Sequence, residues 1–494
     1  MTRVAKPSPL LRRSQRRTKI VATLGPATND PAMLARVLDA GCDCVRLNYS
    51  HDTAEEHARR VEQVRTISAE TGIEVGIMAD LQGPKIRVAR FREGPIQLAE
   101  GDHFSIDAAL ANDAGDQTQV GVTYKELPND VGPGDTLLID DGRIVLRVQK
   151  VVDTAVRCEV VVGGKLSNNK GINREGGGLS AKALTRKDRN DLRHAVELGV
   201  DYIAVSFPRS AEDIREARRL IERAGGNCAI IAKMERAEAI EAADSIIEAS
   251  DGIMVARGDL GVEIGDSALP PVQKRLIKLA RELNRVVITA TQMMESMIEN
   301  PIPTRAEVFD VANAVLDGTD AVMLSAETSV GKYPDRTVEA MARVCMGTER
   351  EWDAQGPDYR LDTAFDRIDE AIAMSAIYAA NRLEARAILA LTESGATTLW
   401  MSRMDTGIPI YAFTRHLATR RRLSLYRGVY PINFDVTSTD HAKVNKEMIE
   451  LLESHGLLKT DDIVVVTKGD LSGRTGGTNA MKIARVGHLV ELTI

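Results

Sequence analysis

The sequence has few aromatic residues, few cysteines, no long apolar run and no excess of positive charge. Aromatic side chains make up 4% of the 494 residues, so a surface that stacks on nucleic-acid bases is not expected. Lysine and arginine total 64 against 71 acidic residues, and the net charge of −7 argues against general DNA binding. No apolar run reaches the roughly 20 residues that a membrane span needs. We therefore expect a soluble protein that binds neither nucleic acid nor membrane.

The cysteines are too few and too scattered for a disulfide framework. They are Cys42, Cys44, Cys158, Cys228 and Cys345. Since no C-x-x-C pair or paired histidine spacing accompanies them, a structural zinc site is not expected either. Buried, reduced thiols in a cytoplasmic protein are the expectation.

Residues 1–17 are rich in basic side chains and contain no acidic one. The basic residues are Arg3, Lys6, Arg12, Arg13, Arg16 and Arg17. The segment lacks the apolar region of a secretory signal. We expect a solvated basic tail at 1–17, with a transit peptide as the alternative.

Eight short β-branched runs alternate with amphipathic helical segments along most of the chain. They begin at Lys19, Cys44, Glu74, Asp201, Cys228, Gly252, Arg285 and Asp320. Near-continuous apolar strands that alternate with helices are typical of a parallel sheet buried on both faces. Eight such units predict an α/β fold, a closed (β/α)₈ (TIM) barrel.

One interval breaks the regular spacing of these runs. The third and fourth runs begin 127 residues apart, whereas the other intervals are 24 to 35 residues. The excess is the size of an inserted domain, and its alternating runs are broken by Pro-Gly, Asp-Gly and Gly-Gly turns. We predict an all-β, mobile lid at 88–179 within a barrel of 18–87 and 180–350. Residues 361–494 predict an open α/β domain that adds no barrel strand.

Polar side chains follow six of the eight predicted strands. They are Arg46, Asn48 and Ser50; Asp80; Lys233 and Glu235; Arg257 and Asp259; Thr289 and Thr291; and Ser325 and Glu327. Any one of them could be a solvated rim residue. Barrel enzymes carry their reactive groups at the carboxyl ends of strands, so six polar ends together predict an active site.

Glu235 and Asp259 end neighbouring strands, which lie about 4.8 Å apart in a sheet. Two carboxylates at that separation repel unless they share a proton or a cation, and Mg²⁺ or Mn²⁺ suits such oxygen ligands. Ion pairs with Arg236 and Arg257 are the alternative. The nearby cations Arg46, Arg87, Lys233 and Arg257 favour a phosphorylated ligand and phosphoryl transfer, although no Walker loop or protein-kinase motif is present.

Long motifs in this chain resemble those of the pyruvate kinase family. They are TKIVATLGPAT, RLNYSH, KGINREGGGLSAKALT, IIAKMERAEAI, VARGDLGVEI, ATQMMESM and PTRAEVFDVANAVLDGTDAVMLSAET. The resemblance extends over nearly the whole chain from Thr18. It implies a barrel with a β lid after the third strand and a C-terminal regulatory domain, which agrees with the partition from spacing.

The resemblance also implies roles for individual residues in transferring a phosphoryl group from phosphoenolpyruvate to ADP, which gives pyruvate and ATP in glycolysis. Lys233 would neutralise the phosphoryl group, Arg46 would contact it, and Glu235 and Asp259 would hold Mg²⁺. A second Mg²⁺ would arrive with ADP. The remaining roles concern proton transfer (Thr291, Ser325 and Glu327), the substrate carboxylate (Ala256, Arg257 and Gly258) and the nucleotide (Asn48, His51, Arg87 and Lys170).

One residue departs from the pattern of many family members, which need K⁺. The K⁺-site equivalents are Asn48, Ser50, Asp80 and Leu81. Lys85 stands where those members carry a glutamate, as in the K⁺-independent branch. The resemblance therefore implies activity without K⁺, with an exposed Lys85 of no such role as the alternative.

The C-terminal domain carries TESGATT at 392–398, where a predicted strand end leads into a helix. Backbone amides at a helix N-terminus can bind an anion. The resemblance implies that Thr392, Glu393, Ser394, Gly395, Ala396 and Thr397 bind a phosphorylated allosteric effector, with a loop at 468–479 closing over it. A Ser/Thr-capped helix without a ligand is the alternative. The family also implies a homotetramer.

Two other functions fit parts of the pattern. A metal-dependent barrel lyase of the aldolase type also pairs Glu and Asp on adjacent strands, but it would need neither Lys233 nor the added domains. A catalytically silent metabolite sensor would keep the C-terminal domain, but loss of Lys233 or Glu235 would then be expected, and both are present.

Overall fold

The structure, a computed structural model, describes residues 9–352, 365–436, 441–470 and 476–488. The chain divides into two compact units. The first unit comprises Met1–Ala79, Leu198–Tyr202 and Ala280–Ile494. The second comprises Asp80–Glu197 and Ile203–Leu279.

Eight parallel strands form a closed barrel, as the sequence predicts. They are β1 (Lys19–Thr23), β2 (Cys44–Asn48), β3 (Gly76–Asp80), β12 (Tyr202–Val205), β13 (Ala229–Met234), β14 (Gly252–Ala256), β15 (Val286–Ala290) and β16 (Ala321–Leu324). The order around the ring is β1-β16-β15-β14-β13-β12-β3-β2. Most residues of these strands are buried, because the barrel interior covers one face and helices cover the other.

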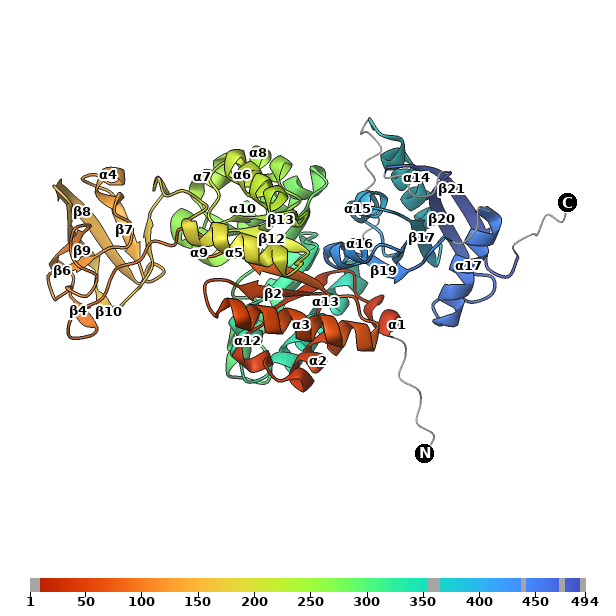
Figure 1. Cartoon of the computed structure of the whole chain (residues 1–494), viewed down its shortest axis with the longest axis horizontal. Coiled ribbons are helices and arrows are strands. Elements are labelled where there is room, and N and C mark those ends of the chain that lie inside the picture. Colours follow the sequence, from red (N-terminus) through yellow and green to blue (C-terminus); the bar gives the residue numbers. More distant parts are fainter. Residues whose placement is uncertain (1–8, 353–364, 437–440, 471–475, 489–494) are drawn as a thin grey trace. The chain divides into compact units, whose positions relative to one another are not determined.

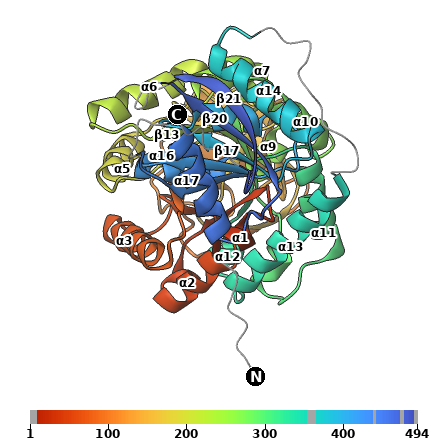
Figure 2. The same ribbon diagram turned by 90° about the vertical axis from the view of Figure 1, so that its right-hand side faces the viewer.

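The helices between the strands begin and end at local capping residues. Asp30 caps α2 by accepting hydrogen bonds from the backbone of Ala32 and Met33. Thr53 and Glu56 form a reciprocal capping box at the start of α3, which ends at Gly72 with φ of 67°. Figure 2 shows α2, α13 and α11 on the outside of the barrel, where α13 contacts the other two.

The barrel helices have the following bounds. They are α2 (Pro31–Asp39), α3 (Ala54–Thr71), α5 (Arg186–Glu197), α6 (Ala211–Arg223), α7 (Ala237–Glu241), α8 (Ala243–Ala249), α9 (Arg257–Ile264), α10 (Leu269–Glu282), α11 (Arg305–Leu316), α12 (Ala326–Ser329) and α13 (Pro334–Trp352). The short 3₁₀ turns η1 (Pro26–Thr28) and η2 (Glu295–Ile298) follow β1 and β15.

The residues between β3 and α5 form the inserted β domain, drawn in orange and yellow in Figure 1. Its elements are β4 (Ile96–Leu98), β5 (His103–Asp107), β6 (Gln119–Gly121), α4 (Leu127–Asp130), β7 (Thr136–Ile139), β8 (Ile144–Val152), β9 (Ala155–Val162), β10 (Gly164–Leu166) and β11 (Ile172–Arg174). Six strands form one sheet in the order β11-β7-β8-β9-β5-β6, in which β5 and β6 alone are paired in parallel. The prediction of a β module here is confirmed; its mobility stays a prediction.

The C-terminal residues form an open α/β sheet in the order β19-β18-β17-β20-β21. Its elements are α14 (Ile368–Arg382), β17 (Ala387–Leu391), α15 (Ala396–Ser402), β18 (Ile410–Thr414), α16 (Leu417–Arg422), η4 (Leu423–Leu425), β19 (Val429–Asn433), α17 (His441–Ser454), β20 (Ile463–Gly469) and β21 (Thr478–Arg485). The prediction of a loop over 468–479 is wrong at both ends. Residues 468–469 and 478–479 belong to β20 and to the antiparallel edge strand β21, and 471–475 lie outside the described residues.

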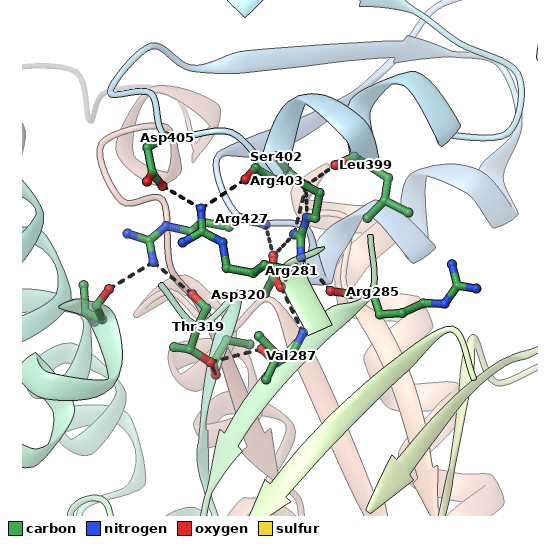
Figure 3. Close-up of polar contacts among 12 residues, drawn as sticks. Arg281, Arg285, Val287, Thr319, Asp320, Leu399, Ser402, Arg403, Asp405 and Arg427 are labelled. Atoms are coloured by element: carbon green, nitrogen blue, oxygen red, sulfur yellow. Dashed lines mark hydrogen bonds and ion pairs between the residues drawn. The ribbon is translucent and has the colours of Figure 1, made fainter. Parts of the chain in front are cut away.

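A buried ion pair joins the C-terminal domain to the barrel within the first unit (Figure 3). Arg403, just after α15, donates through both guanidinium nitrogens to the Asp320 carboxylate, which precedes β16. Both side chains are 1% exposed. Asp320 also accepts from the backbone of Val287 and Arg427, at 2.9 and 3.1 Å. Each oxygen of the buried Asp320 carboxylate thus has donors, which offsets its loss of water on burial.

The expectation of a solvated basic tail is wrong for Arg13, Arg16 and Arg17. Helix α1 (Pro9–Arg13) precedes β1, and Arg13 and Arg16 form ion pairs with the buried Asp43. The Arg17 guanidinium is hydrogen-bonded to the backbone oxygens of Glu349 and Thr406. Arg16 and Arg17 are buried and Arg13 is partly buried, because each finds an acceptor that offsets the loss of water. Arg3 and Lys6 lie outside the described residues.

Two expectations about composition can be compared with the structure. All five cysteines are buried and free of disulfides, as predicted, and burial raises the pKa of Cys42, Cys158 and Cys345 to about 12. Within the described ranges, none of the helices combines the length and apolarity required to cross a bilayer.

Candidate active site

Lys233 lies at the centre of a cluster of buried charges in the second unit. It is the fifth residue of β13, and its side chain is 11% exposed. Its ammonium is 2.8 Å from Glu235 Oε1, 3.2 Å from Asp80 Oδ1 and 2.7 Å from Ser206 Oγ. The Ser206 hydroxyl donates in turn to the Leu81 carbonyl oxygen at 2.7 Å. The cationic end of Lys233 is therefore held in one position at the ends of three adjacent strands.

Glu235 has little access to water and is held from two sides. Its second oxygen accepts a hydrogen bond from the backbone N–H of Phe207 at 2.9 Å. Phe207 has a φ of 54°, a left-handed conformation that is unusual for a bulky residue. Burial raises the pKa of the Glu235 carboxyl, the Lys233 ammonium lowers it, and Asp259 and Asp80 raise it further. The negative charge of Glu235 is thus stabilised by a cation and opposed by its two carboxylate neighbours.

Asp259 lies in the first turn of α9, directly after β14. Lys85 Nζ is 3.1 Å from Asp259 Oδ1, and both side chains are partly exposed. The sequence associated Lys85 with Asn48, Ser50 and Asp80, whereas the structure gives it an ion pair with a predicted metal ligand. This difference arises because Lys85 lies on the segment that leaves β3, opposite α9, and its stem passes over Gly171.

The first unit contains the other predicted catalytic residues. Arg46 is the third of the five residues of β2, and its guanidinium donates to Thr23 Oγ1 at 3.1 Å. The Asn48 side-chain oxygen accepts from the backbone of Ser50 at 3.1 Å, and His51 is exposed in the same turn. Thr23 was not among the predicted site residues.

Thr291 and Glu327 lie on the turns after β15 and β16. Thr291 has a φ of 68°, and its hydroxyl donates to the Ala290 carbonyl oxygen at 2.7 Å. The buried Glu327 carboxylate accepts from the backbone N–H groups of Ser325 and Met294, at 2.6 and 3.2 Å. Burial raises the pKa of Glu327, and these backbone donors lower it. The Met294 contact joins the turn that carries Thr291 to Glu327.

The remaining predicted residues lie where the strand ends and the linkers place them. Ala256 is the last residue of β14, and Arg257 and Gly258 begin α9. Arg87 donates to the Asn169 carbonyl oxygen at 2.9 Å, and Lys170 Nζ is 2.7 Å from Asp140 Oδ1. These contacts place Arg87 and Lys170 near each other on the two chain segments that connect the inserted β domain.

In the predicted effector segment, several hydrogen-bonding groups are already bonded to hydroxyl groups of the segment itself. Thr392 and Ser394 accept from the backbone N–H groups of Gly395 and Ala396, and the Thr397 hydroxyl is 2.8 Å from that of Thr478. Glu393 forms a hydrogen bond with His416. These contacts are those of a capped helix start; effector binding stays a prediction.

Comparison with known proteins assigns the family. Residues 15–338 match the domain described as pyruvate kinase, barrel domain, and 370–484 match pyruvate kinase, alpha/beta domain. The chain belongs to the pyruvate kinase family. This membership sets aside the lyase and the silent sensor considered above.

Individual pyruvate kinases match over almost their full length. Pyruvate kinase II of Salmonella typhimurium is 56% identical over 96% of this chain and 99% of its own. The Haemophilus influenzae pyruvate kinase is 54% identical over 92% of this chain and 96% of its own. The crystal structure of a pyruvate kinase from Cryptosporidium parvum superposes with a TM-score of 0.89 at 33% identity, covering 98% of this chain and 99% of that one. The chain is accordingly a pyruvate kinase, a phosphotransferase with a (β/α)₈ barrel.

Proposed function

We propose that the enzyme transfers the phosphoryl group of phosphoenolpyruvate to ADP, giving pyruvate and ATP as in glycolysis. The observation that carries the proposal is the buried Lys233 ammonium, fixed by Asp80, Glu235 and Ser206 at the carboxyl end of the barrel. Phosphoryl transfer requires positioning and neutralisation of the charge on the transferred group more than covalent catalysis. An ammonium that is already oriented supplies this neutralisation without reorganisation during the reaction.

The side chains around Lys233 fit a divalent cation. Among Asp80, Glu235, Asp259, Lys85 and Lys233, carboxylates outnumber ammonium groups by one, and Asp259 raises the pKa of Glu235. Hard carboxylate oxygens of this kind suit Mg²⁺ or Mn²⁺. In the described part of the chain no group of three or more acidic, His or Cys side chains forms a complete metal site, so Glu235 and Asp259 would supply only part of the coordination.

Other residues of the chain would bind the substrates and assist proton transfer. Mg²⁺ held by Glu235 and Asp259 would supply charge neutralisation for the transferred group, and a second Mg²⁺ would come with ADP. Arg46 contacts the transferred phosphate, the amides of 256–258 hold the substrate carboxylate, and Arg87 binds the nucleotide phosphates together with Lys170, Asn48 and His51. The Thr291 hydroxyl positions the group that protonates the enolate, with Ser325 and Glu327 as further members of that relay.

A coupled assay with lactate dehydrogenase, phosphoenolpyruvate, ADP and Mg²⁺ tests the function. With the wild-type enzyme, lactate dehydrogenase should oxidise NADH only when phosphoenolpyruvate, ADP and Mg²⁺ are all present. Lys233→Met should lower kcat by roughly 10³-fold, since an electrostatic stabiliser of the transition state is removed. Its circular dichroism spectrum should remain that of the wild type. Lys187→Met is the matched control, because Lys187 is half-exposed and pairs with Asp191 on α5. Near-normal turnover of the Lys233 variant would overturn its role.

We extend the proposal to assembly and regulation. The proposed location is the cytoplasm. A homotetramer is supported by apolar side chains that are exposed on the barrel, Ile302, Phe309, Leu316 and Val330, and on the C-terminal domain, Ile368, Tyr378, Leu383 and Ile483. Apolar exposure of this kind marks interaction surfaces. A phosphorylated effector would bind at 392–397, where its phosphate would compete with the internal hydroxyl contacts.

A further inference from the structure

Helix α9 contacts both linkers of the inserted β domain within the second unit. The outgoing linker, residues 81–88, is held through Lys85, whose ammonium pairs with Asp259. The returning linker, residues 170–179 including the short strand β11, is held through Asn173, whose amide Nδ2 donates to Glu263 Oε1 at 3.3 Å. Asp259 and Glu263 are one helical turn apart, so they lie on the same face of α9. One eight-residue helix thus holds both linkers.

Glu263 has contacts that extend beyond Asn173. Its other oxygen accepts from the backbone N–H of Ala237, at the start of α7, at 3.0 Å. Its backbone carbonyl oxygen accepts from the N–H of Gly176 at 3.0 Å. The side chain is buried, and Arg236 and Glu238 are the charged side chains that influence its pKa, Arg236 lowering it and Glu238 raising it. A buried carboxylate with two donors is held in one position.

The returning linker has little conformational stability of its own. Gly176, Gly177 and Gly178 all have positive φ, and glycine in this region loses much conformational freedom when it is ordered. The N–H of Gly178 donates to Glu238 Oε1 at 2.5 Å, and the Leu179 carbonyl oxygen accepts from Arg236 at 2.9 Å. The order of this segment therefore depends on side chains of the barrel helices.

The two linkers also pair with each other beside α9. The N–H of Ile172 donates to the Ile86 carbonyl oxygen at 2.9 Å, and Arg87 and Gly171 form an antiparallel bridge. Between the linkers and α9 lies a cavity of about 20 Å³, lined on one side by Phe207. Because a cavity of this size holds about one water, a shift of α9 relative to the linkers meets packed side chains.

We propose that Glu263 is a positioning residue of the enzyme: through Asn173 it fixes the returning linker to the helix that carries Asp259, and so sets the position of Arg87 and Lys170. The inference rests on the proposed function, in which Arg87 and Lys170 bind the nucleotide. Glu263 does not touch the reacting atoms. Its loss should affect the use of ADP more than the binding of the cation.

Swapping the hydrogen-bond donor and acceptor between Asn173 and Glu263 by substitution tests the contact between them. Asn173→Asp places two carboxylates opposite each other, and Glu263→Gln removes one of two acceptors, so each variant should break the contact. In the double variant, the introduced glutamine can accept from the Ala237 N–H and donate to the introduced aspartate, which restores the hydrogen bond with reversed polarity. Gln149→Ala is the matched control, because it removes an amide–carboxylate hydrogen bond, Gln149 to Glu159, in the same domain and away from the linkers.

Two readouts separate positioning from general destabilisation. In the metal-free, substrate-free protein, hydrogen exchange at Gly176 and Gly178 should be roughly tenfold faster in each single variant, with the barrel strands unchanged. In the assay at pH 8, KM for ADP should rise roughly fivefold while the Mn²⁺ dissociation constant changes less than about twofold. In the double variant, both the exchange rate and the KM for ADP should return most of the way to the wild-type values. The control should change neither.

The outcomes are distinct from those for the proposed function. The inference would be overturned if the hydrogen-exchange rates of the returning linker were those of the wild type in all four variants. It would also be overturned if the single variants showed faster exchange and a higher KM for ADP that the double variant did not reverse. Absence of phosphotransfer in the wild type would instead overturn the proposed function, and the exchange measurement would still decide whether the contact orders the linker. If Asn173→Asp does not fold, Glu263→Gln alone must show the exchange and KM changes for the inference to stand.

Discussion

At the scale of single residues, Lys85 gives the sharpest prediction about cofactors. Its ammonium already provides a fixed positive charge against Asp259. We therefore expect turnover in a K⁺-free, tetramethylammonium-buffered assay to be within about twofold of that with K⁺, whereas Lys85→Met should lose about tenfold, or ~1.4 kcal/mol of transition-state stabilisation. The control Lys187→Met should match the wild type under both conditions. A large stimulation of the wild type by K⁺ would contradict the prediction.

Glu263 should make stability depend on pH. Burial raises its pKa from 4.5 to about 7, so between these values the folded state holds a proton that the unfolded state has released. The folded state is therefore favoured below pH 4.5 and loses this advantage as pH rises through 7, by about 3 kcal/mol in all. Glu263→Gln does not titrate. Urea unfolding of both proteins from pH 5 to 8 should show the wild type losing stability relative to the variant; parallel curves would contradict the shifted pKa.

Sequence reasoning selected the charged residues that cluster around Lys233 because they lie at or just after the ends of predicted strands, although their roles stay a prediction. Lys233 is the fifth residue of β13 and Glu235 directly follows the strand, and the rule that barrel sites lie at strand ends was sufficient to select both. The same rule, applied to the fourth strand, would have found Ser206. The partner of Lys85 could not be predicted, since it depends on how α9 packs against a linker 174 residues away in sequence.

At the scale of elements, the junction after α15 should depend strongly on its buried ion pair. Arg403→Met leaves the Asp320 carboxylate buried without its cation, which costs about 3–5 kcal/mol. We expect a marked fall in the thermal unfolding midpoint of the variant. The control is the ion pair Lys332–Glu299, whose side chains are 62% and 66% exposed; Lys332→Met should cost less than about 1 kcal/mol. Equal effects of both substitutions would show that the junction does not depend on Arg403.

The elements were predictable where local periodicity and caps agree, as at Asp30 before α2. Two predictions failed where tertiary partners decide the outcome. The edge strand β21 has polar and exposed positions because only one side is paired, so its sequence has no clear alternation. The basic residues Arg13 and Arg16 look like a solvated tail in sequence, and only the position of Asp43 reveals why they are buried.

At the scale of the whole molecule, the repeating strands predicted the barrel and a break in their spacing predicted the insertion. Assembly is less accessible to sequence reasoning, because an interface residue differs from a core residue only in exposure. Phe309 lies within the periodic pattern of α11, yet it is 75% exposed. Only the folded structure distinguishes an interface residue from a core residue.

The exposed face of α11 leads to a prediction about the oligomeric state of the enzyme in solution. If Phe309 packs against a second copy, Phe309→Glu buries an unpaired charge at that contact, which is strongly unfavourable. Sedimentation velocity should then show a tetramer for the wild type and smaller species for the variant, with the circular dichroism spectrum unchanged. Val162→Glu is the control, since Val162 is an exposed apolar residue of the inserted domain, and it should sediment as the wild type. A tetramer that tolerates Phe309→Glu would place the interface elsewhere, because a buried carboxylate without a partner cannot be accommodated at a packed contact.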